Sequence, residues 1–517
     1  MTFFRKKGKV FVVVMMIAVL AFAIAGCNRS SGTQTASAGT DTSTPVTLRM
    51  YLLGDRSKDF DLVYAEINKI LKEKVNATVE VSFLSWAEHA QRYSLLFAGG
   101  EDFDLIFTAS GWAHYETTAS MGGFYPLTET FIQTYAPGIW QTVPSMAWDQ
   151  ARLGGNIYMV PNYANEFGVD VYAVRGDLMR KYGYNDITSL EELVAFFGQV
   201  ADGEAAAGLR PQGNAAGMLY PYMHSAGFAV LNGSPSELFL INTQNMSDTK
   251  VYYLLDWDRY EPFCRDMENF FNRGFWSRDS LASSDQRQDG LLRGTSASMY
   301  WNLGSTKRYA TEANAAHPEW DVTLVDFASR WPKRVNSYIN NGVAINAASK
   351  NKERAMMVLN EFYTNKAVYD LAAYGIEGTH WAAEGDQYYR TLPRTSDYGI
   401  SANCNWGWNN LNLSRSEFIP NPTALDRKHD EILARWNANV KPEHPLDGFS
   451  FDKSSLTTEL SIIDSLIAEY YTPLISGMAG NATTAMAALR QQLDSAGIRR
   501  VIDEVNRQAE AFLASKR

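Results

Sequence analysis

The chain has 517 residues, of which 46% are hydrophobic and 20% are charged, so it can bury a large core and is not an intrinsically disordered protein. Its 57 acidic residues exceed its 47 lysines and arginines, and this balance argues against a nucleic-acid backbone as the ligand. Three cysteines are too few for a scaffold built on disulfides. At roughly 100 to 200 residues per domain, we expect two to four domains or lobes.

The first 26 residues have the organisation of a secretory signal. Four basic residues precede an uncharged apolar stretch, which ends in the sequence IAGC at Cys27. The stretch is shorter than the roughly 20 apolar residues that a membrane-spanning helix needs. The sequence IAGC resembles the bacterial lipobox, in which cleavage precedes the cysteine and its thiol becomes diacylglyceryl-modified. We therefore expect a lipoprotein signal peptide at residues 1–26 and lipidation of Cys27.

Residues 27–45 are expected to form a flexible tether. The segment 28–44 consists mainly of Ser, Thr, Gly and Ala and has no bulky apolar residue that could join a core. Without the signal, 43 basic and 57 acidic residues remain, a formal charge of −14, so we expect anchoring by lipid rather than by charge. The sequence leaves open whether Cys264 and Cys404 form a disulfide or remain two buried thiols.

The mature chain alternates strand-like and helix-like segments. Helical spacing of apolar residues is seen at Phe60, Val63, Ile67, Ile70 and Leu71. The strand-like segments are VTLRMYLL at 46–53, ATVEVSFL at 77–84, FDLIFTA at 103–109, VDVYAV at 169–174 and VTLVDF at 322–327, with a further helix expected around 190–200. Strands that alternate with helices predict an α/β protein with mainly parallel, doubly wound sheets.

The end of the chain is expected to be helical and packed. Two sets of apolar residues recur at helical spacing there: Leu456, Leu460, Ile463, Ile467 and Tyr470 in the first, and Ile498, Ile502, Val505 and Phe512 in the second.

Sequence motifs of the common enzyme classes are missing, among them GxSxG, HExxH, GxxxxGK[ST], GxGxxG and CxxC. The seven histidines do not occur at the spacing of metal ligands, and Asp256 and Asp258 lack the glycine and distal acid of a calcium loop. We therefore expect no metal and no cofactor. A pair of carboxylates for glycoside hydrolysis stays open, because their separation is a property of the folded chain.

Aromatic residues often stand beside amides. They include Trp86, Trp112 with Tyr115, Trp301 with Asn302, Tyr338 with Asn340 and Asn341, and the segment SANCNWGWNNLNLS at 401–414. A sugar lays its C–H face on an aromatic ring, and its hydroxyl rim bonds to amides and carboxylates. Such clusters indicate a carbohydrate cleft. The alternative for each ring is that it fills the core or covers a loop. Trp406 and Trp408 would share one face only in an extended segment.

Four stretches together resemble the family 1 extracellular solute-binding proteins of carbohydrate ABC transporters, the group around maltodextrin-binding protein. FDLIFTASGWAHY is similar to the family's strand and the loop after it, GNIYMVPNYANEFGVDVYAV to its first crossover, and NGVAINAASKNKERAMMVLNEFY to its second crossover and helix. YGIEGTHW at 374–381, with DSAGIRRVIDEVNRQAEAF near the end, resembles the LplA-type lipoprotein subgroup.

The resemblance implies a two-lobe, type II periplasmic-binding-protein-like (Venus-flytrap) fold with doubly wound sheets and a helical C-terminal region. Lobe 1 is expected at 46–163 plus about 343–385, and lobe 2 at about 164–342 plus 386–517. The implied protein is a monomer held by lipid at the extracytoplasmic face of the cell membrane, in a periplasm or at a cell surface. It captures an oligosaccharide between the lobes and delivers it to the permease subunits of an ABC importer, without catalytic residues.

The resemblance also places ligand-binding residues. Trp112 is the leading stacking residue, because it follows the strand DLIFT after which the family places one, and Trp86 follows an earlier strand. At the first crossover, ligand contact and ordinary hinge hydrogen bonding are both open for Asn162, Tyr163, Asn165 and Glu166. The further expected residues are Trp301, Asn302, Asn340, Glu377, His380, Trp381, Trp406 and Asn409, although glycines on both sides of Ile376 and Glu377 also suit a structural turn.

Two other functional classes stay open: a surface glycoside hydrolase or esterase, and a sensor or adhesin that uses the same fold without transport. The negative charge of the chain predicts a neutral or weakly charged cargo. A local basic pocket made by Arg330, Lys333 and Arg334 would instead favour uronate-containing oligosaccharides.

Overall fold

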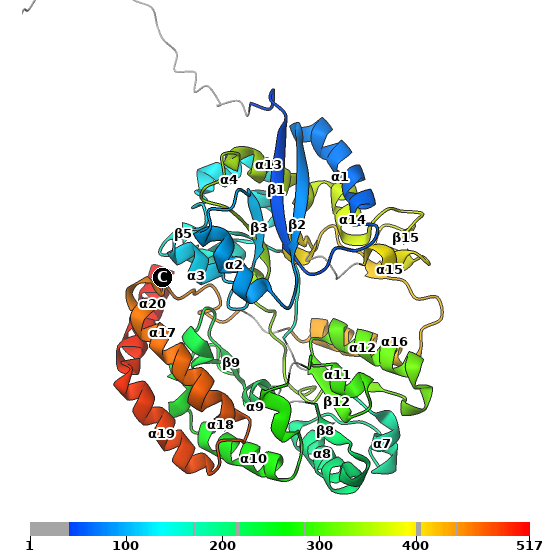
Figure 1. Ribbon diagram of the computed structural model, residues 1–517, viewed down its shortest axis with the longest axis vertical. Coiled ribbons are helices and arrows are strands. Elements are labelled where there is room, and N and C mark those ends of the chain that lie inside the picture. Colours follow the sequence, from blue (N-terminus) through cyan, green and yellow to red (C-terminus); the bar gives the residue numbers. More distant parts are fainter. Residues whose placement is uncertain are drawn as a thin grey trace, which may run out of the picture. The chain divides into compact units, whose positions relative to one another are not determined.

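The computed structural model describes residues 41–168, 171–213, 218–283, 285–399, 405–440 and 443–516 (Figure 1). The expected signal peptide, Cys27 and Cys404 lie outside these ranges. Among the helices described, none is both long and apolar enough to cross a bilayer. Residues 42–517 form one compact unit, in which two sets of secondary structure surround separate hydrophobic cores. The arrangement is the two-lobe α/β architecture expected from the sequence.

The first lobe is built on a five-stranded sheet in the order β2-β1-β3-β14-β6. Its strands are β1 (Val46–Leu53), β2 (Ala77–Leu84), β3 (Leu105–Thr108), β6 (Val160–Pro161) and β14 (Gly342–Ile345). The three N-terminal strands pair in parallel, as expected, whereas β14 is antiparallel to β3 and to β6. The chain thus returns from the second lobe into the middle of the first sheet.

Helices cover this sheet, and their apolar faces make the first core. Helix α1 (Phe60–Val75) buries Phe60, Val63, Ile67 and Leu71, which are four of the residues whose spacing predicts it. The other helices are α2 (His89–Ala98), α3 (Tyr115–Ser120), α4 (Glu129–Tyr135), α5 (Pro137–Thr142), α6 (Ser145–Gln150), α13 (Lys352–Thr364) and α14 (Lys366–Tyr374), and a short hairpin joins β4 (Arg152–Leu153) to β5 (Asn156–Ile157). Tyr398 and Trp408 also belong to this core, although they lie beyond residue 385, and the exact lobe limits stay a prediction.

The second lobe holds a four-stranded sheet in the order β13-β7-β12-β8 and a three-stranded antiparallel sheet in the order β11-β10-β9. The strands are β7 (Val171–Val174), β8 (Arg210–Gln212), β12 (Ser296–Trp301), β13 (Thr323–Val325), β9 (Phe228–Val230), β10 (Phe239–Asn242) and β11 (Val251–Tyr253). Only β8 and β12 are parallel, because β7 is antiparallel to both of its neighbours. The expectation of mainly parallel sheets is therefore wrong for this lobe: connections this long can bring a strand back in either direction.

The helices of the second lobe pack around these two sheets. They are α7 (Gly176–Lys181), α8 (Leu190–Glu204), α9 (Leu219–Ser225), α10 (Tyr260–Asn272), α11 (Asp289–Leu292), α12 (Leu303–Ala316) and α16 (Ala424–Ala438). The C-terminal helices α17 (Thr457–Leu466), α18 (Thr472–Ile475), α19 (Ala482–Ser495) and α20 (Ile498–Ser515) join the same core (Figure 1).

A π-helical turn changes one of the expected helix faces. Leu460 and Ile463 are buried as the spacing predicts, but Tyr471 is the buried tyrosine, whereas Tyr470 packs against the core only partly buried. The turn Ile467–Tyr471 is π-helical, and the extra residue in such a turn rotates the following side chains around the axis.

Three chain segments pass between the lobes. One of them, residues 418–423, connects β17 with α16, and the other two run side by side. Phe167 pairs with Val335 in an antiparallel bridge, and the Asn336 N–H donates to the Glu166 carbonyl at 2.7 Å. At the first-lobe end, the Asn162 N–H donates to the Asn341 carbonyl at 3.1 Å. We refer to residues 162–168 and 333–341 as the crossover segments. Their mutual hydrogen bonds give the linkage a defined geometry while leaving few residues to bend.

A third, smaller structure completes the first lobe. The hairpin β15 (Trp381–Glu384) and β16 (Tyr388–Thr391) takes up β17 (Ser416–Glu417) as a parallel third strand, and α15 (Thr395–Tyr398) follows the hairpin. The short helices η6 (Tyr338–Asn340) and η7 (Asn405–Trp408) bring two further segments against the first sheet.

Candidate ligand-binding site

Three tryptophans from distant parts of the chain gather on the first lobe. The ring of Trp86 is stacked with that of Trp406, with centroids 6.3 Å apart and planes 4° from parallel. Trp112 lies 6.1 Å from Trp86. The residues Trp86 and Trp112 remain 45% and 38% exposed, which is unusual for side chains of this size. We call these three residues the indole cluster.

The first sheet positions the indole cluster through the ends of its strands. Trp86 follows β2, and Trp112 lies in the turn after β3, where Gly111 has a φ of +74°. The carboxylate of Glu116 holds this turn by accepting hydrogen bonds from the Gly111 N–H and the Ser110 hydroxyl. The turn therefore presents Trp112 on a fixed backbone rather than on a loose loop.

Trp406 reaches the cluster because η7 packs tightly onto β3. The ring of Phe107 on β3 lies next to two of the three tryptophans, with its centroid 5.5 Å from that of Trp112 and 6.2 Å from that of Trp406. A Cβ atom at Gly407 would come within 2.8 Å of the Phe107 ring, so only glycine permits this approach. The contact between Trp406 and Phe107 thus depends on Gly407, the glycine of the sequence WGW.

Amides of the crossover segments surround one carboxylate beside the rings. Glu166 accepts hydrogen bonds from the side-chain amides of Asn162 at 3.3 Å, Asn340 at 3.1 Å and Asn341 at 3.1 Å. We call these four residues the crossover amide cluster. Burial raises the pKa of Glu166 above its usual value, and the amide donors oppose that rise by stabilising the charged form.

Hydrogen bonds join the indole cluster to the crossover amide cluster. The indole N–H of Trp112 donates to the carbonyl of Asn340 at 3.1 Å, and that of Trp406 donates to the side-chain oxygen of Asn341 at 2.9 Å. Exposed ring faces therefore stand next to amide and carboxylate groups at the point where the chain leaves the first lobe. This combination suits a ligand with flat C–H faces and a rim of hydroxyls.

Two members of this site were not expected from the sequence. Phe107 lies on an expected buried strand, and His89 stands 5.8 Å from Trp86 and 6.2 Å from Trp112. The nearby His114 is partly buried, which lowers its pKa. A signal existed for His89 alone, since it follows Trp86 by three residues, which places it at about one helical turn.

Three further residues that were expected to bind the ligand belong to neither the indole cluster nor the crossover amide cluster. The first-crossover residue Tyr163 has its ring 6.3 Å from Tyr338, and its N–H donates to the Asn409 carbonyl at 2.8 Å. Asn165 is exposed between the other crossover residues. These positions leave ligand contact a prediction for Tyr163, Asn165 and Asn409.

On the second lobe, Trp301 ends β12 and stacks on Tyr309 at 6.1 Å, with the Arg287 guanidinium 5.3 Å from its ring centroid. Asn302 begins α12 as its N-cap, and its side chain accepts from the Ser305 N–H at 2.9 Å. Asn302 therefore serves as a helix cap. Trp301 is partly exposed and remains the residue expected to stack on the ligand from the second lobe.

The YGIEGTHW segment is a structural turn. His380 is fully buried, with Nδ1 accepting from the Ile376 N–H at 2.9 Å and Nε2 3.1 Å from the Asp59 carboxylate. The hydrogen bond with His380 is the main cause that lowers the pKa of Asp59. Trp381 is also buried and donates to the Gly375 carbonyl at 2.9 Å. Neither ring faces solvent, so the alternative of a structural turn describes this segment. Of its three expected ligand residues, only Glu377 is exposed.

Acidic neighbours neutralise the expected basic patch. Lys333 is buried, 3.4 Å from Asp326, and its ammonium lies 4.8 Å from the ring centroid of Trp436. Arg334 is paired with Asp447. Only Arg330 is exposed, so these residues do not form a pocket for a polyanion.

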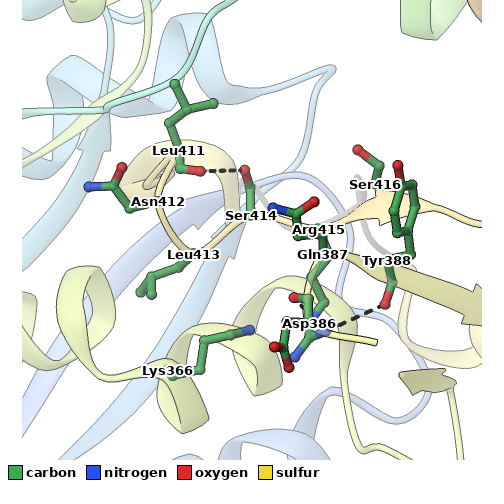
Figure 2. A pocket seen from close by; sticks show the side chains of 10 residues that line it. All are labelled: Lys366, Asp386, Gln387, Tyr388, Leu411, Asn412, Leu413, Ser414, Arg415 and Ser416. Atoms are coloured by element: carbon green, nitrogen blue, oxygen red, sulfur yellow. Dashed lines mark hydrogen bonds between the residues drawn. The ribbon is translucent and has the colours of Figure 1, made fainter. Parts of the chain in front are cut away.

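The structure also has a separate pocket of about 560 Å³ on the first lobe (Figure 2). It is bordered by Lys366, Asp386, Gln387, Tyr388, Leu411, Asn412, Leu413, Ser414, Arg415 and Ser416. No member of the indole cluster or of the crossover amide cluster lines it. The convergence of exposed rings and polar groups, rather than the presence of a pocket, selects the crossover as the candidate site.

Within the described ranges, no three His, Cys, Asp or Glu side chains gather as metal ligands would. Cys264 is a free thiol in the second core, and burial raises its pKa to about 12.

Comparisons with known proteins agree with this architecture. The chain is 26% identical, over 97% of its length and 97% of the relative's, to a carbohydrate ABC transporter substrate-binding protein of Streptococcus pneumoniae. It is also similar to the crystal structure of the N-glycan transport solute-binding protein NgtS from Streptococcus pneumoniae, with a TM-score of 0.70 and 24% identity over 92% of this chain and all of that one. The fold is that of a two-lobe solute-binding protein.

More distant solute-binding structures share the same fold. The alginate-binding protein AlgQ2 superposes with a TM-score of 0.65 at 14% identity, over 91% of this chain and 99% of that one. Residues 445–514 match a family described as a domain of unknown function, DUF3502. In this solute-binding fold that segment contains α17 to α20, the helices that pack on the core of the second lobe.

Proposed function

We propose that the chain is the extracytoplasmic binding protein of a carbohydrate ABC importer and captures an oligosaccharide between its lobes. One observation carries the proposal: three tryptophans gather here, two of them well exposed, and Trp112 and Trp406 donate hydrogen bonds to Asn340 and Asn341, whose side chains surround Glu166. Stacking faces beside groups that both donate and accept hydrogen bonds are what a sugar ring requires. The 26% identical relative, named as a carbohydrate transporter component, supports the same class of ligand.

The position of the site supports a closing mechanism. Both crossover segments supply residues to the amide cluster, so a ligand bound there touches the part of the chain that must bend. A ligand that also contacts the second lobe, with Trp301 as the expected ring, stabilises the closed form by its differential affinity. The permease subunits then receive the loaded, closed protein.

Neutral glycans are the proposed cargo. Lys333 and Arg334 are both engaged by carboxylates, so neither favours a uronate at the crossover. NgtS has been crystallised with Man1GlcNAc and with Man5GlcNAc. These two glycans are therefore the first ligands to test.

Lipidation of Cys27 and the tether of residues 27–45 complete the proposal. A lipid anchor with a flexible tether keeps a monomeric binding protein close to its membrane partner and raises its effective concentration there. The glycan is passed on unchanged, and neither a cofactor nor a catalytic residue takes part.

A screen of the full-length protein in mild detergent tests the proposal. Thermal unfolding is measured with a panel of glycans that includes Man1GlcNAc and Man5GlcNAc, and with a panel of peptides. A ligand at one hundred times its Kd stabilises the native state by about 2.7 kcal/mol, which shifts the midpoint measurably. A shift with glycans and no sugar product by chromatography is expected. A shift with peptides alone, or release of a shortened glycan, would contradict the proposal.

A further inference from the structure

The separate pocket lies where the β15–β16 turn meets the loop 411–416 and the start of α14. In Figure 2, Asn412 and Leu413 stand on one side, Tyr388 and Ser416 on the other, and Lys366 and Asp386 below. Most of these residues are polar, and the proposed cargo site uses none of them. The pocket needs a ligand that is itself mainly polar.

A nearly buried arginine gives the pocket a rigid frame. Arg415 Nη1 donates to the carbonyls of Gly385 and Asp386, each at 3.0 Å, and Nη2 is 3.3 Å from the Asp370 carboxylate. Its guanidinium also lies 5.1 Å from the ring centroid of Trp381. These bonds fix the turn between β15 and β16. The Nε atom of Arg415 is buried and finds no hydrogen-bond partner in the described part of the chain.

The rim of this frame carries unused binding groups. Tyr388 is 46% exposed, so one face of a large ring is open to solvent. The side chains of Gln387, Asn412 and Ser416 are exposed, and none bonds to another residue in the described ranges. Amides and hydroxyls both donate and accept, as sugar hydroxyls do, and a phenol ring offers a stacking face.

Charge selects a neutral ligand here. Lys366 and Arg415 share the carboxylate of Asp370, and Asp386 brings a second carboxylate to the pocket, so the two positive charges are matched by two negative ones. A polyanion such as a phosphate or sulfate ester would find no free cation among these lining residues. A neutral sugar unit meets no such mismatch.

The pocket is also close to the indole cluster along the chain. Trp406 and Leu411 are five residues apart, and a fully extended chain of that length spans at most about 18 Å. The true separation is shorter, because η7 is helical at Trp406. Leu411 is in turn fixed to the crossover, with its N–H donating to the Tyr163 carbonyl at 2.8 Å. A glycan of several units can therefore reach from one site to the other.

We propose that the pocket around Tyr388, Gln387 and Asn412 is an outer carbohydrate subsite, which holds the distal units of the oligosaccharide whose first units lie on the indole cluster. The inference depends on the proposed function. It predicts that this pocket makes the protein bind long glycans more tightly than short ones.

Titration calorimetry of the full-length protein with Man1GlcNAc and Man5GlcNAc tests the subsite. The double variant Tyr388→Ala/Asn412→Ala removes the ring and one amide from an exposed rim, and a thermal melt confirms that it folds. We expect its Kd for Man5GlcNAc to rise about tenfold or more, while its Kd for Man1GlcNAc stays within twofold of wild type. Phe418→Ala is the matched control, because Phe418 is 43% exposed just beyond β17 and does not line the pocket.

Two results would overturn the subsite while leaving the proposed function intact: an unchanged Kd for Man5GlcNAc in the double variant, or an equal loss for both glycans. Failure of the wild-type protein to bind either glycan would instead contradict the neutral N-glycan cargo, and the outer subsite would fall with it.

Discussion

Removing the indole of Trp112 is the perturbation for which the structure gives the clearest magnitude. Trp112 is 38% exposed, and a tryptophan side chain of ~250 Å² then offers about 95 Å² of ring surface to a ligand. If a sugar covers between half and all of this surface, burial at ~25 cal/mol per Å² contributes about 1.2 to 2.4 kcal/mol. Trp112→Ala is therefore expected to raise the Kd for a bound glycan by about 8- to 60-fold.

The assay is titration calorimetry of wild type and Trp112→Ala with the same glycan, after a thermal melt has confirmed folding. Trp320→Ala is the matched control. Trp301, the ring expected to meet the ligand from the second lobe, lies at the beginning of α12, whereas Trp320 lies beyond the C-terminal end of that helix. The 14 residues of α12 separate these positions by about 21 Å, so the control should leave the Kd unchanged. Equal Kd values for Trp112→Ala and wild type would refute the stacking role.

Three further predictions concern charge, the turn at 374–381 and the anchor. Burial raises the pKa of Glu166, so its protonated form stabilises the native state below about pH 4.3, and this contribution is lost as pH rises through the raised pKa. Glu166→Gln should flatten that decline in urea unfolding measured across pH, and an unchanged pH profile would contradict it. His380→Ala leaves the partly buried Ile376 N–H without its acceptor and should lower the unfolding free energy by about 1 to 3 kcal/mol, with the glycan Kd unchanged; a weaker Kd would restore a binding role. Cys27→Ser should abolish incorporation of labelled palmitate in cells, and retained label would exclude lipidation at this position.

The sequence predicts elements best where one local pattern decides them. The spacing of Phe60, Val63 and Ile67 predicts α1, and the alternation in ATVEVSFL predicts β2, because in both cases one face must be buried. Strand direction is different. The antiparallel pairing of β7 with β12 depends on connections of more than a hundred residues, about which local patterns carry no information.

In the candidate site, too, local patterns predict some features, and others depend on contacts between distant parts of the chain. Trp86 and Trp112 follow predicted strands, so their place at the sheet edge could be expected from the sequence. Their contact with Trp406 depends on how η7 packs on Phe107, which no local pattern indicates. The aromatic and histidine content of YGIEGTHW looks like a binding motif, yet His380 is buried against Asp59, a residue 321 positions earlier. Burial of this kind is a tertiary property and separates structural rings from those that can meet a ligand.

A crystal structure of the protein with Man5GlcNAc tests the central claim most directly. The account predicts a sugar ring lying against Trp112 or Trp86, with its hydroxyls within hydrogen-bonding distance of Glu166 or Asn340. A glycan bound elsewhere on the chain, with the indole cluster and the crossover amides untouched, would contradict it.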